Sequence, residues 1–326
     1  MTGRPRIEEV ARVAGVSRST VSRVINGAPH VSAAARDAVH RAIARLGYSP
    51  NHAARTLAGR RANAIALVVS EPGSRVLADP FFAGVLRGVH AELAGQTQLV
   101  LMMNPSDDLV AYLSGGHVDG AIVVSLHGED PLPQLLHDKG LPIVVGGRPL
   151  AGAVPYVDSD NFNGALEATR HLVSLGRTRI ACVAGPRDMA VGRDRLSGWR
   201  RGMHGLPADL VEHADFTPQD GAKAMAALLD RAPDLDAVFV AADIMALGAL
   251  KILHERGRRV PEDVAVVGFD DSVLAATAVP PLTTVRQDVE RFGRTLTWRL
   301  LAELNGAEGL PPSILLPTEL VHRDSA

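Results

Sequence analysis

The sequence has little of what marks secreted, membrane or metal-binding proteins. Its single cysteine, Cys182, lies in the apolar run IACVAG, so no internal disulfide can form and neither a thiolate nucleophile nor a cysteine-ligated metal is expected. No run of eighteen apolar residues occurs, and the opening residues MTGRPRIEEV lack the apolar segment of a secretory signal. We therefore expect a protein of the reducing cytoplasm.

The motifs of common enzyme classes are missing as well. Neither of the glycine-rich phosphate loops, GxGxxG or GxxxxGK[ST], opens a helix after the first apolar run. The histidines show no metal-ligand spacing, and no nucleophile is accompanied by a base and an orienting group. His127 alone follows a strand end closely enough to reach a ligand, unless it is simply a solvated loop side chain. The sequence thus predicts no enzyme, no cofactor and no metal site.

Lysine is missing from residues 1–61, whereas arginine is abundant there. Eleven arginines against three acidic residues give this segment a formal charge of +8, and the remainder of the chain carries −10. A basic module before an acidic body is expected where one part meets a polyanion and the rest must not grip it non-specifically.

Three short helices are predicted in the basic segment. Apolar residues at helical spacing lead to Gly15, which ends the first helix. Ser17 can cap the second helix, which ends before Gly27. Ser32 can cap the third, which ends at Gly47. Three short helices with a tight turn between the first two make a helix-turn-helix unit.

The second helix lies in GVSRSTVSRVING and has two unlike faces. At about 100° per residue, its apolar side chains fall opposite its polar ones. The polar side chains are Arg18, Ser19, Ser22, Arg23 and Asn26, and the apolar ones are Val21, Val24 and Ile25. The apolar face is expected to pack, which leaves the polar face either to contact a partner or merely to be solvated.

The stretch SPNHAARTLAGRRAN, from Ser49 to Asn63, is the expected linker. Pro50 disfavours helix at the residue before it and can start a new short helix together with Asn51. A short helix with little apolar surface is marginal in water, so we expect it to order only when DNA or another partner supports it.

From Ala64 onward, apolar runs alternate with helical patterns. Continuous Val, Ile and Ala runs are typical of parallel strands whose two faces are covered by helices. The runs are AIALVVS, LVLMMN, DGAIVVS, PIVVGG, RIACVAG, LVEHADF, DAVFVAAD and VAVVGFDD. The body is therefore expected to be α/β with doubly wound parallel sheets.

The body is large for one open sheet, and an acidic turn, VDSDNFNG at Val157–Gly164, divides it into nearly equal halves. Two lobes with a ligand cleft between them are predicted. Ligands of such sheets bind beyond the carboxyl ends of the strands, where polar residues collect here. These residues are Ser125, Gly147, Arg148, Asp160, Asn161, Asp243, Asp270 and Asp271.

Long stretches of the chain match one known family. The first is RIEEVARVAGVSRSTVSRVINGAPHVSAAARDAVHRAIARLGYSPNHAARTL, and later ones are DPFF, RLSGW, ADIMALGAL, VPEDVAVVGFDDS and PPLTTVRQD. With these stretches the chain resembles, over nearly its whole length, the lactose-repressor (LacI/GalR) family of bacterial regulators. Within that family, SLHGEDPLP, VGGRPL and DRAPDLDAVF are most similar to the actinobacterial regulators of cellulose and β-glucoside utilisation.

The resemblance implies three parts and a body like that of periplasmic binding proteins. They are a helix-turn-helix DNA-binding domain at 1–49, a hinge helix and linker at 50–62, and a two-lobed effector-binding and dimerisation domain at 63–326. The chain is expected to cross between the lobes near 157–164, 284–290 and 312–318.

By the same resemblance, the second helix enters the major groove of DNA. Arg18, Ser19 and Arg23 then hold base-reading positions, where an arginine bonds guanine O6 and N7 together and discriminates by ~1–3 kcal/mol. Leu57 matches a leucine wedged into the minor groove, unless it simply packs within the linker. The other expected DNA contacts are Ser17, Asn51, Ala54 and Arg55, with Thr20, Ser22 and Asn26 at phosphates.

In the body, Arg195 of RLSGW and Asp270 of GFDDS match the family's main effector-gripping positions. A guanidinium donates to vicinal hydroxyls and a carboxylate accepts from them, which suits a sugar. Only one of Phe81 and Phe82 is expected to face the cleft, because adjacent phenylalanines that open a helix are often core. Asp243 either contacts the ligand or caps the helix that follows it. The remaining expected effector contacts are Asp79, Ser125, Arg148, Asp160, Trp199 and Gln287.

Three positions depart from the family's usual residues. Gly147 stands where many relatives have aspartate, Ala242 stands where asparagine is frequent, and Ser125 replaces a larger polar side chain. These smaller groups leave room in the cleft, which favours an oligosaccharide such as cellobiose over a monosaccharide or a purine.

The sequence therefore predicts a homodimeric transcriptional repressor that binds a palindromic operator and is released from it by a sugar. The chain closes with LVHRDSA and shows no heptad repeat of the tetrameric family members, which favours a dimer. A co-repressor-type regulator, tightened by its ligand, uses the same parts and stays an alternative. A sugar-binding protein without DNA function would account for the two lobes but not for the +8 segment.

Overall fold

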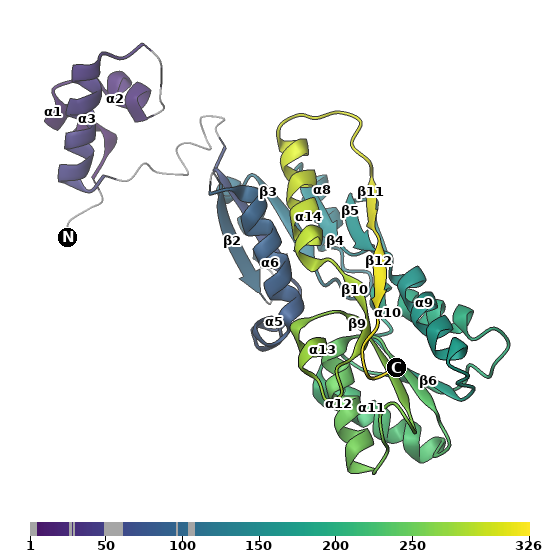
Figure 1. Ribbon diagram of the computed structural model, residues 1–326. Helices are drawn as coiled ribbons and strands as arrows, with labels where there is room; N and C mark the ends of the chain where they lie inside the picture. Colours follow the sequence, from purple (N-terminus) through teal and green to yellow (C-terminus); the bar gives the residue numbers. More distant parts are fainter. Residues whose placement is uncertain (1–4, 26–27, 29, 49–60, 96, 104–107) are drawn as a thin grey trace. The chain divides into compact units, whose positions relative to one another are not determined.

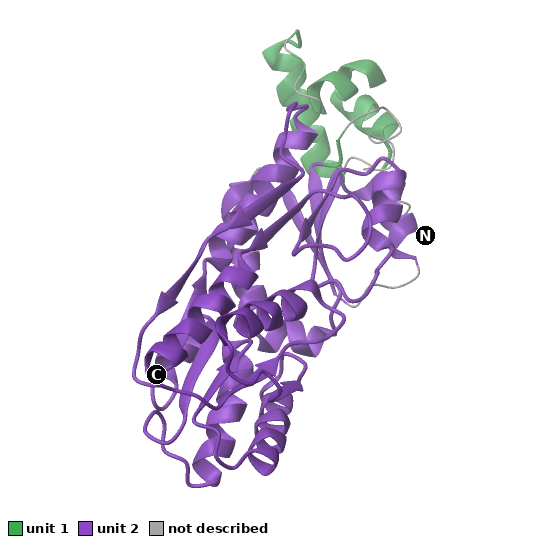
Figure 2. Cartoon of the chain, turned by 90° about the vertical axis from the view of Figure 1, so that its right-hand side faces the viewer, with its two compact units in different colours: residues 1–62 green, residues 63–326 purple. Residues whose placement is uncertain are grey.

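The computed structural model describes residues 5–25, 28, 30–48, 61–95, 97–103 and 108–326. The chain forms two compact units, residues 1–62 and residues 63–326, which Figure 2 distinguishes by colour. Most of the expected hinge and linker lies outside the described residues. The same holds for five expected DNA contacts, namely Asn26, Asn51, Ala54, Arg55 and Leu57.

The first unit contains the three predicted helices, α1 (Ile7–Ala14), α2 (Arg18–Ile25) and α3 (Ala33–Leu46). Gly15 and Gly47 follow α1 and α3 with φ of 67° and 62°, a left-handed conformation that glycine adopts without strain. The hydroxyl of Ser32 accepts a hydrogen bond from the backbone N–H of Ala35 at 3.3 Å and caps α3. The predicted helix-turn-helix arrangement is confirmed, and its core is Val10, Ala11, Val21, Val24, Val39 and Ala42.

The second unit is built on two six-stranded sheets, each the centre of one lobe. Lobe 1 has the strand order β11-β5-β4-β3-β1-β2. Its strands are β1 (Ala64–Val69), β2 (Gln98–Met103), β3 (Gly120–Val124), β4 (Ile143–Gly146), β5 (Tyr156–Ser159) and β11 (Ser313–Leu316). Its helices are α5 (Gly73–Ala78), α6 (Pro80–Leu93), α7 (Leu109–Tyr112), α8 (Leu132–Asp138) and α14 (Val289–Leu304), with a π-helical turn at Leu113–His117.

Lobe 2 has the strand order β12-β10-β9-β8-β6-β7. Its strands are β6 (Ile180–Ala184), β7 (Val211–His213), β8 (Ala237–Val240), β9 (Ala265–Asp270), β10 (Thr283–Gln287) and β12 (Thr318–Val321). Its helices are α9 (Asn161–Ser174), α10 (Ala190–Gly202), α11 (Pro218–Arg231), α12 (Asp243–Glu255) and α13 (Val273–Thr277).

Helices cover both sheets, as the buried apolar runs predict. In lobe 2, α9 packs with α10 and α11 packs with α12, while in lobe 1 α6 lies beside α14 (Figure 1). Gly88 permits the last approach, because a Cβ there would come within 2.1 Å of the Glu290 carbonyl oxygen. The predicted doubly wound α/β body is confirmed. None of the helices among the described residues is long and apolar enough to cross a membrane.

Two expectations about the strands need correction. The stretch Val157–Gly164 is not a turn, because it belongs to β5 and α9 with only Asp160 between them. Its polar side chains suggested exposure, yet Asp158 is buried and accepts hydrogen bonds from Asn161 and from the N–H of Ser159. The lobe 2 sheet is also not wholly parallel, since β12 runs antiparallel to β10.

The chain passes between the two sheets three times. The passages join β5 to α9, β10 to α14, and β11 to β12. All of these strands lie at the same end of their sheets, so one end of the interlobe cleft is bridged by the backbone and the opposite end is not.

Candidate functional site

The outward face of α2 is the first candidate site. Val21 and Val24 are 0% and 7% exposed and hold the helix against the core of the three-helix unit, called the headpiece below. Arg18, Ser19 and Arg23 are exposed on its other side. All three side chains expected to read bases are therefore open to a partner.

Ser17 has a structural task at the start of α2. Its hydroxyl accepts from the backbone N–H of Thr20 at 3.1 Å and forms hydrogen bonds with the hydroxyls of Thr20 and Ser19 at 2.8 and 2.7 Å. Arg18 Nε lies 3.4 Å from Glu8 Oε1. Since both partners are largely exposed, this ion pair contributes only about 0–1 kcal/mol and a phosphate or a base can displace it.

The second candidate site is a cavity between the lobes. Its empty space, with the solvent at its open mouth included, is about 810 Å³. The expected effector residues that line it are Asp79, Phe81, Phe82, Ser125, Arg148, Arg195, Asp270 and Gln287. Asn161 and Gly147, expected among the polar residues beyond the strand ends, line it too, and lining residues that were not expected include Arg75, Asp158, Met189, Phe216 and Phe292.

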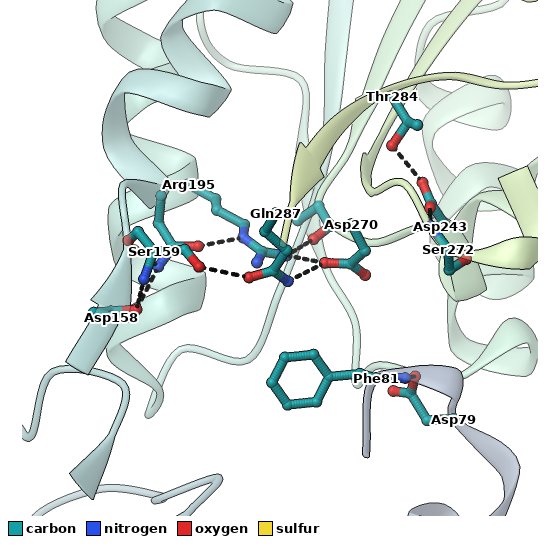
Figure 3. Close-up of polar contacts among 12 residues, drawn as sticks. Asp79, Phe81, Asp158, Ser159, Arg195, Asp243, Asp270, Ser272, Thr284 and Gln287 are labelled. Atoms are coloured by element: carbon teal, nitrogen blue, oxygen red, sulfur yellow. Dashed lines mark hydrogen bonds and ion pairs between the residues drawn. The ribbon is translucent and has the colours of Figure 1, made fainter. Parts of the chain in front are cut away.

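Arg195 is the centre of the polar wall. It extends from α10, is 3% exposed, and its guanidinium lies 3.6 Å from the centroid of the Phe269 ring. Nε donates to Asn161 Oδ1 at 2.9 Å, and Nη1 donates to the Ala241 carbonyl at 2.6 Å and to Asp270 Oδ1 at 3.3 Å (Figure 3). These bonds fix the plane of the guanidinium before any ligand arrives.

Gln287 links this group to lobe 1. Its amide nitrogen donates to Asp270 Oδ1 at 2.6 Å, and its oxygen accepts from the Ser159 hydroxyl at 2.9 Å. Burial raises the pKa of Asp270 to about 6, although the Arg195 charge opposes that rise. Burial likewise raises the pKa of Asp158 to about 6. The end of the cleft that the three chain passages bridge, called the hinge end below, is distinct from the expected hinge at residues 50–62. The hinge end holds two carboxylates, Asp158 and Asp270, whose ionised form depends on their polar neighbours.

Two of the six non-glycine residues with positive φ in the described part of the chain line the cleft. Ser125 and Asp270 have φ of 62° and 116°, values that non-glycine residues rarely adopt. Such conformations persist where the surrounding structure fixes them, and they are frequent at ligand sites.

Aromatic rings provide apolar surface from lobe 1. Asp79 accepts from the N–H of Phe81 at 2.9 Å and caps α6, which places both residues across the open space from Asp270 and Gln287 (Figure 3). The Phe81 ring packs at 5.4 Å from that of Phe82 and 6.2 Å from that of Phe292. Both adjacent phenylalanines line the cavity, against the expectation of one, because Phe82 reaches it while remaining 6% exposed in the lobe 1 core.

Arg148 lines the cavity but is already paired. Its Nη2 donates to both carboxylate oxygens of Asp194 on α10, at 2.7 and 2.9 Å, and its N–H donates to Asp158. The ion pair joins lobe 1 to lobe 2, so a ligand contact by Arg148 competes with an existing bond between the lobes.

Three expected effector residues lie away from the cavity. Trp199 is fully buried in the lobe 2 core. Asp160 caps α9 by accepting from the N–H of Asn163 at 3.1 Å. Asp243 is fully buried and points to Thr284 and the N–H of Ser272, at 2.6 and 2.8 Å (Figure 3).

The buried position of Asp243 corrects both of its expected roles. It neither lines the cavity nor caps α12, because its carboxylate ties β10 to the turn after β9. Burial, with repulsion from Asp270, raises its pKa to about 8. The sequence could not show where the Asp243 side chain points, since an aspartate at the start of a helix serves equally as a cap or as a ligand contact.

His127 bridges the lobes instead of being a solvated loop residue. Its Nε2 lies 3.0 Å from Glu71 Oε1 in lobe 1, and its Nδ1 lies 2.9 Å from Asp188 Oδ2 in lobe 2. The hydrogen bond to Glu71, followed by that to Asp188, raises the pKa of His127 to about 9 despite partial burial. A protonated imidazolium between two carboxylates is the consequence.

Other chemistries find no site among the described residues. No group of three His, Cys, Asp or Glu side chains in the described part of the chain could hold a metal ion. Cys182 is buried, and burial raises the pKa of its thiol.

Sequence reasoning missed the residues that follow β1 and β7. Glu71 and Arg75 come just after the first apolar run, and Phe216 follows a short strand, but none lies in a recognised motif. The usable signal was their position beyond strand ends, where ligands of parallel sheets bind.

Comparisons with known proteins agree with the fold. Residues 6–51 match the family of bacterial regulatory proteins, lacI family, and residues 169–326 match the periplasmic binding protein-like domain. The chain is 50% identical to the HTH-type transcriptional regulator CelR of Thermobifida fusca, over 99% of this chain and 98% of that protein. It resembles a solved CelR–cellobiose complex with a TM-score of 0.79 and 48% identity, covering 99% of this chain and 100% of the other.

A second structural relative is the lac repressor dimer bound to operator and the anti-inducer ONPF, with a TM-score of 0.86, 29% identity and 99% of each chain covered. These relatives are transcriptional regulators, which confirms the expectation of a regulator in place of an enzyme. The resemblance read from the sequence is likewise confirmed: the chain belongs to the lacI family of bacterial regulatory proteins and is a DNA-binding transcriptional regulator.

Proposed function

We propose that the protein is a cytoplasmic, homodimeric repressor that binds a palindromic operator and releases it when a β-linked disaccharide such as cellobiose enters the cleft. Residues 1–49 bind DNA, residues 50–62 form the hinge, and residues 63–326 bind the effector and dimerise. The observation that carries the proposal is the preset polar group around Arg195, in a chain 48% identical to a regulator solved with cellobiose.

The polar group suits sugar hydroxyls. Arg195 Nη2 and Asp270 Oδ2 have no hydrogen-bond partner within the described part of the chain, whereas the other side of each group is fixed by protein bonds. A donor and an acceptor that face one cavity match a pair of neighbouring hydroxyls, each of which can donate and accept. The Phe81 ring across the space supplies the flat apolar surface that a pyranose face requires.

The DNA-binding part of the proposal rests on α2. Arg18 and Arg23 are exposed on one face and can donate in a bidentate manner to guanine in the major groove. Ser17 and Thr20 are committed to the helix start, so they position α2 and leave base reading to the arginines.

Sugar and operator act on each other by linkage. If the sugar favours an arrangement of the lobes that separates the two hinges of a dimer, the operator weakens sugar binding by the same factor.

The decisive experiment is fluorescence anisotropy on a labelled palindrome with a central CG step, titrated with cellobiose. Release of the DNA supports the proposal, and tighter binding identifies a co-repressor-type regulator. The matched control is Asp270→Asn, which keeps the operator affinity but does not respond to the sugar. If no sugar changes the operator affinity of the wild type, the effector assignment is wrong.

A further inference from the structure

The cleft extends well beyond the polar group around Arg195 and Asp270 at its hinge end. In lobe 1, β5 and β1 are three strand steps apart, and in lobe 2 the same number separates β9 from β7. Neighbouring strands lie ~4.8 Å apart, so the cleft floor extends ~14 Å between these strand ends. A pyranose ring spans about one strand spacing, which leaves room beyond the ring that Arg195 and Asp270 would hold.

Three side chains define the distal end of the cleft, opposite the three chain passages. Glu71 and Arg75 follow β1 in lobe 1, and Phe216 follows β7 in lobe 2. Arg75 and Phe216 line the same cavity as Arg195 and Asp270. The distal end is thus part of one continuous space, with a different chemistry.

Arg75 has an unsatisfied donor at this end. Its Nη1 donates to Glu71 Oε2 at 2.9 Å, and the guanidinium lies 5.6 Å from the centroid of the Phe216 ring. Its Nε–H is buried and has no hydrogen-bond partner in the described part of the chain. Nη2 has no hydrogen-bond partner there either and, unlike Nε, is not buried, so it is the donor that a ligand oxygen in the cavity can reach.

Glu71 holds Arg75 in place and neutralises it. Glu71 is 3% exposed and also accepts from the Ser125 hydroxyl at 2.7 Å and from His127 at 3.0 Å. Burial alone would raise the pKa of Glu71, but the hydrogen bonds from His127 and Ser125 lower it. Because the positive charge of Arg75 is matched by this carboxylate, the distal end suits neutral hydroxyls better than a phosphate or a carboxylate.

We propose that Arg75 and Phe216 form a second sugar subsite, which holds the second ring of a disaccharide and makes the protein select disaccharides over monosaccharides. Arg75 Nη2 donates to a hydroxyl or the ring oxygen of that second sugar. Phe216 supports the flat face of the guanidinium, and Met189 adds apolar contact. The subsite rests on the proposed function, since the first ring must occupy the hinge end.

The test compares the Kd of cellobiose and of glucose by titration calorimetry in wild type and Arg75→Met. Methionine retains an apolar stem but removes every donor. We expect the Kd of cellobiose to rise about 10- to 100-fold, as for a hydrogen bond from a charged group. The Kd of glucose, which needs the hinge end alone, should change less than twofold.

Two further variants complete the test. Arg75→Lys keeps a charge beside Glu71 but lacks the second guanidinium nitrogen, Nη2, so it should lose cellobiose affinity as Arg75→Met does, even if the latter folds poorly. Arg87→Met on α6, a side chain 66% exposed, should leave both affinities unchanged.

An unchanged Kd for cellobiose, or equal losses for both sugars, overturns the second subsite while the proposed function stands. A wild type that binds neither sugar overturns the proposed function itself, and the second subsite with it.

Discussion

The helix face of α2 and the interlobe cleft recognise partners in opposite ways. On α2 the arginines extend into solvent, and the ion pair of Arg18 with Glu8 joins two exposed side chains. In the cleft, Arg195 is 3% exposed, and its bonds to Asn161 and Asp270 orient two other cleft residues. Function and stability are therefore separable on α2 and coupled in the cleft.

The largest effect is expected where this coupling is strongest, at Arg195→Ala. The change leaves the buried Asp270 without its counter-charge and Asn161 without its donor. Removing one partner of a buried pair costs about 3–5 kcal/mol, which urea unfolding should show together with loss of cellobiose binding. Since the pKa of Asp270 is raised and a proton can replace the lost cation, the deficit in unfolding free energy should be smaller at pH 5 than at pH 7.

Arg201→Ala is the matched control for this change. Arg201 lies on the same helix, α10, and is exposed. The free energy of unfolding of the Arg201→Ala variant should stay within about 0.5 kcal/mol of that of the wild type. A similar loss in both variants would show that the cleft arginine has no special energetic role.

On α2, Arg18→Ala should change affinity without changing stability. Losing a bidentate contact to guanine weakens specific operator binding by ~1–3 kcal/mol, or roughly 5- to 150-fold, whereas the Kd for sugar stays the same. Anisotropy titration on specific and scrambled DNA measures this. Arg18→Lys keeps the charge but not the fork, so wild-type specificity in that variant would assign Arg18 to a phosphate instead.

The same contrast explains what the sequence could predict. The headpiece helices and the buried strands depend on local signals, such as the caps at Ser32 and Gly47 and the continuous apolar runs. Arg195 and Asp270 followed from resemblance, and the structure does place them together.

The sequence-based predictions that were wrong concern residues whose surroundings depend on contacts between distant segments. Trp199 and Asp243 look like ligand residues in the sequence, but packing turns one into the lobe 2 core and the other toward β10. His127 meets Asp188 only because β3 and β6 end at facing edges of different sheets. No periodicity or local motif encodes such a meeting.

The smallest effect is expected at the distal end of the cleft, at His127. His127 joins Glu71 to Asp188 across the lobes, and the N–H of Gly128 donates to the Asp188 carbonyl at 2.8 Å. Its pKa is raised to about 9 by the hydrogen bonds with the two carboxylates. A histidine with a raised pKa in the folded state stabilises fully below its unfolded value of about 6.5, and this stabilisation is lost as the pH rises through 9.

We therefore expect the free energy of unfolding to fall between pH 7 and pH 9.5, and to fall less in His127→Gln, because glutamine carries no proton to lose. The window is separate from that of Asp158 and Asp270, whose raised pKa values of about 6 affect stability in more acidic solution. Asp243, with a pKa raised to about 8, adds to the fall below pH 8 in both proteins, so the difference between their slopes reports His127. Urea unfolding at half-unit pH steps measures both, with the exposed His254→Gln on α12 as the control. If His127→Gln keeps the wild-type slope above pH 7, His127 is neutral in the folded protein, and hydrogen bonds without its positive charge join the lobes there.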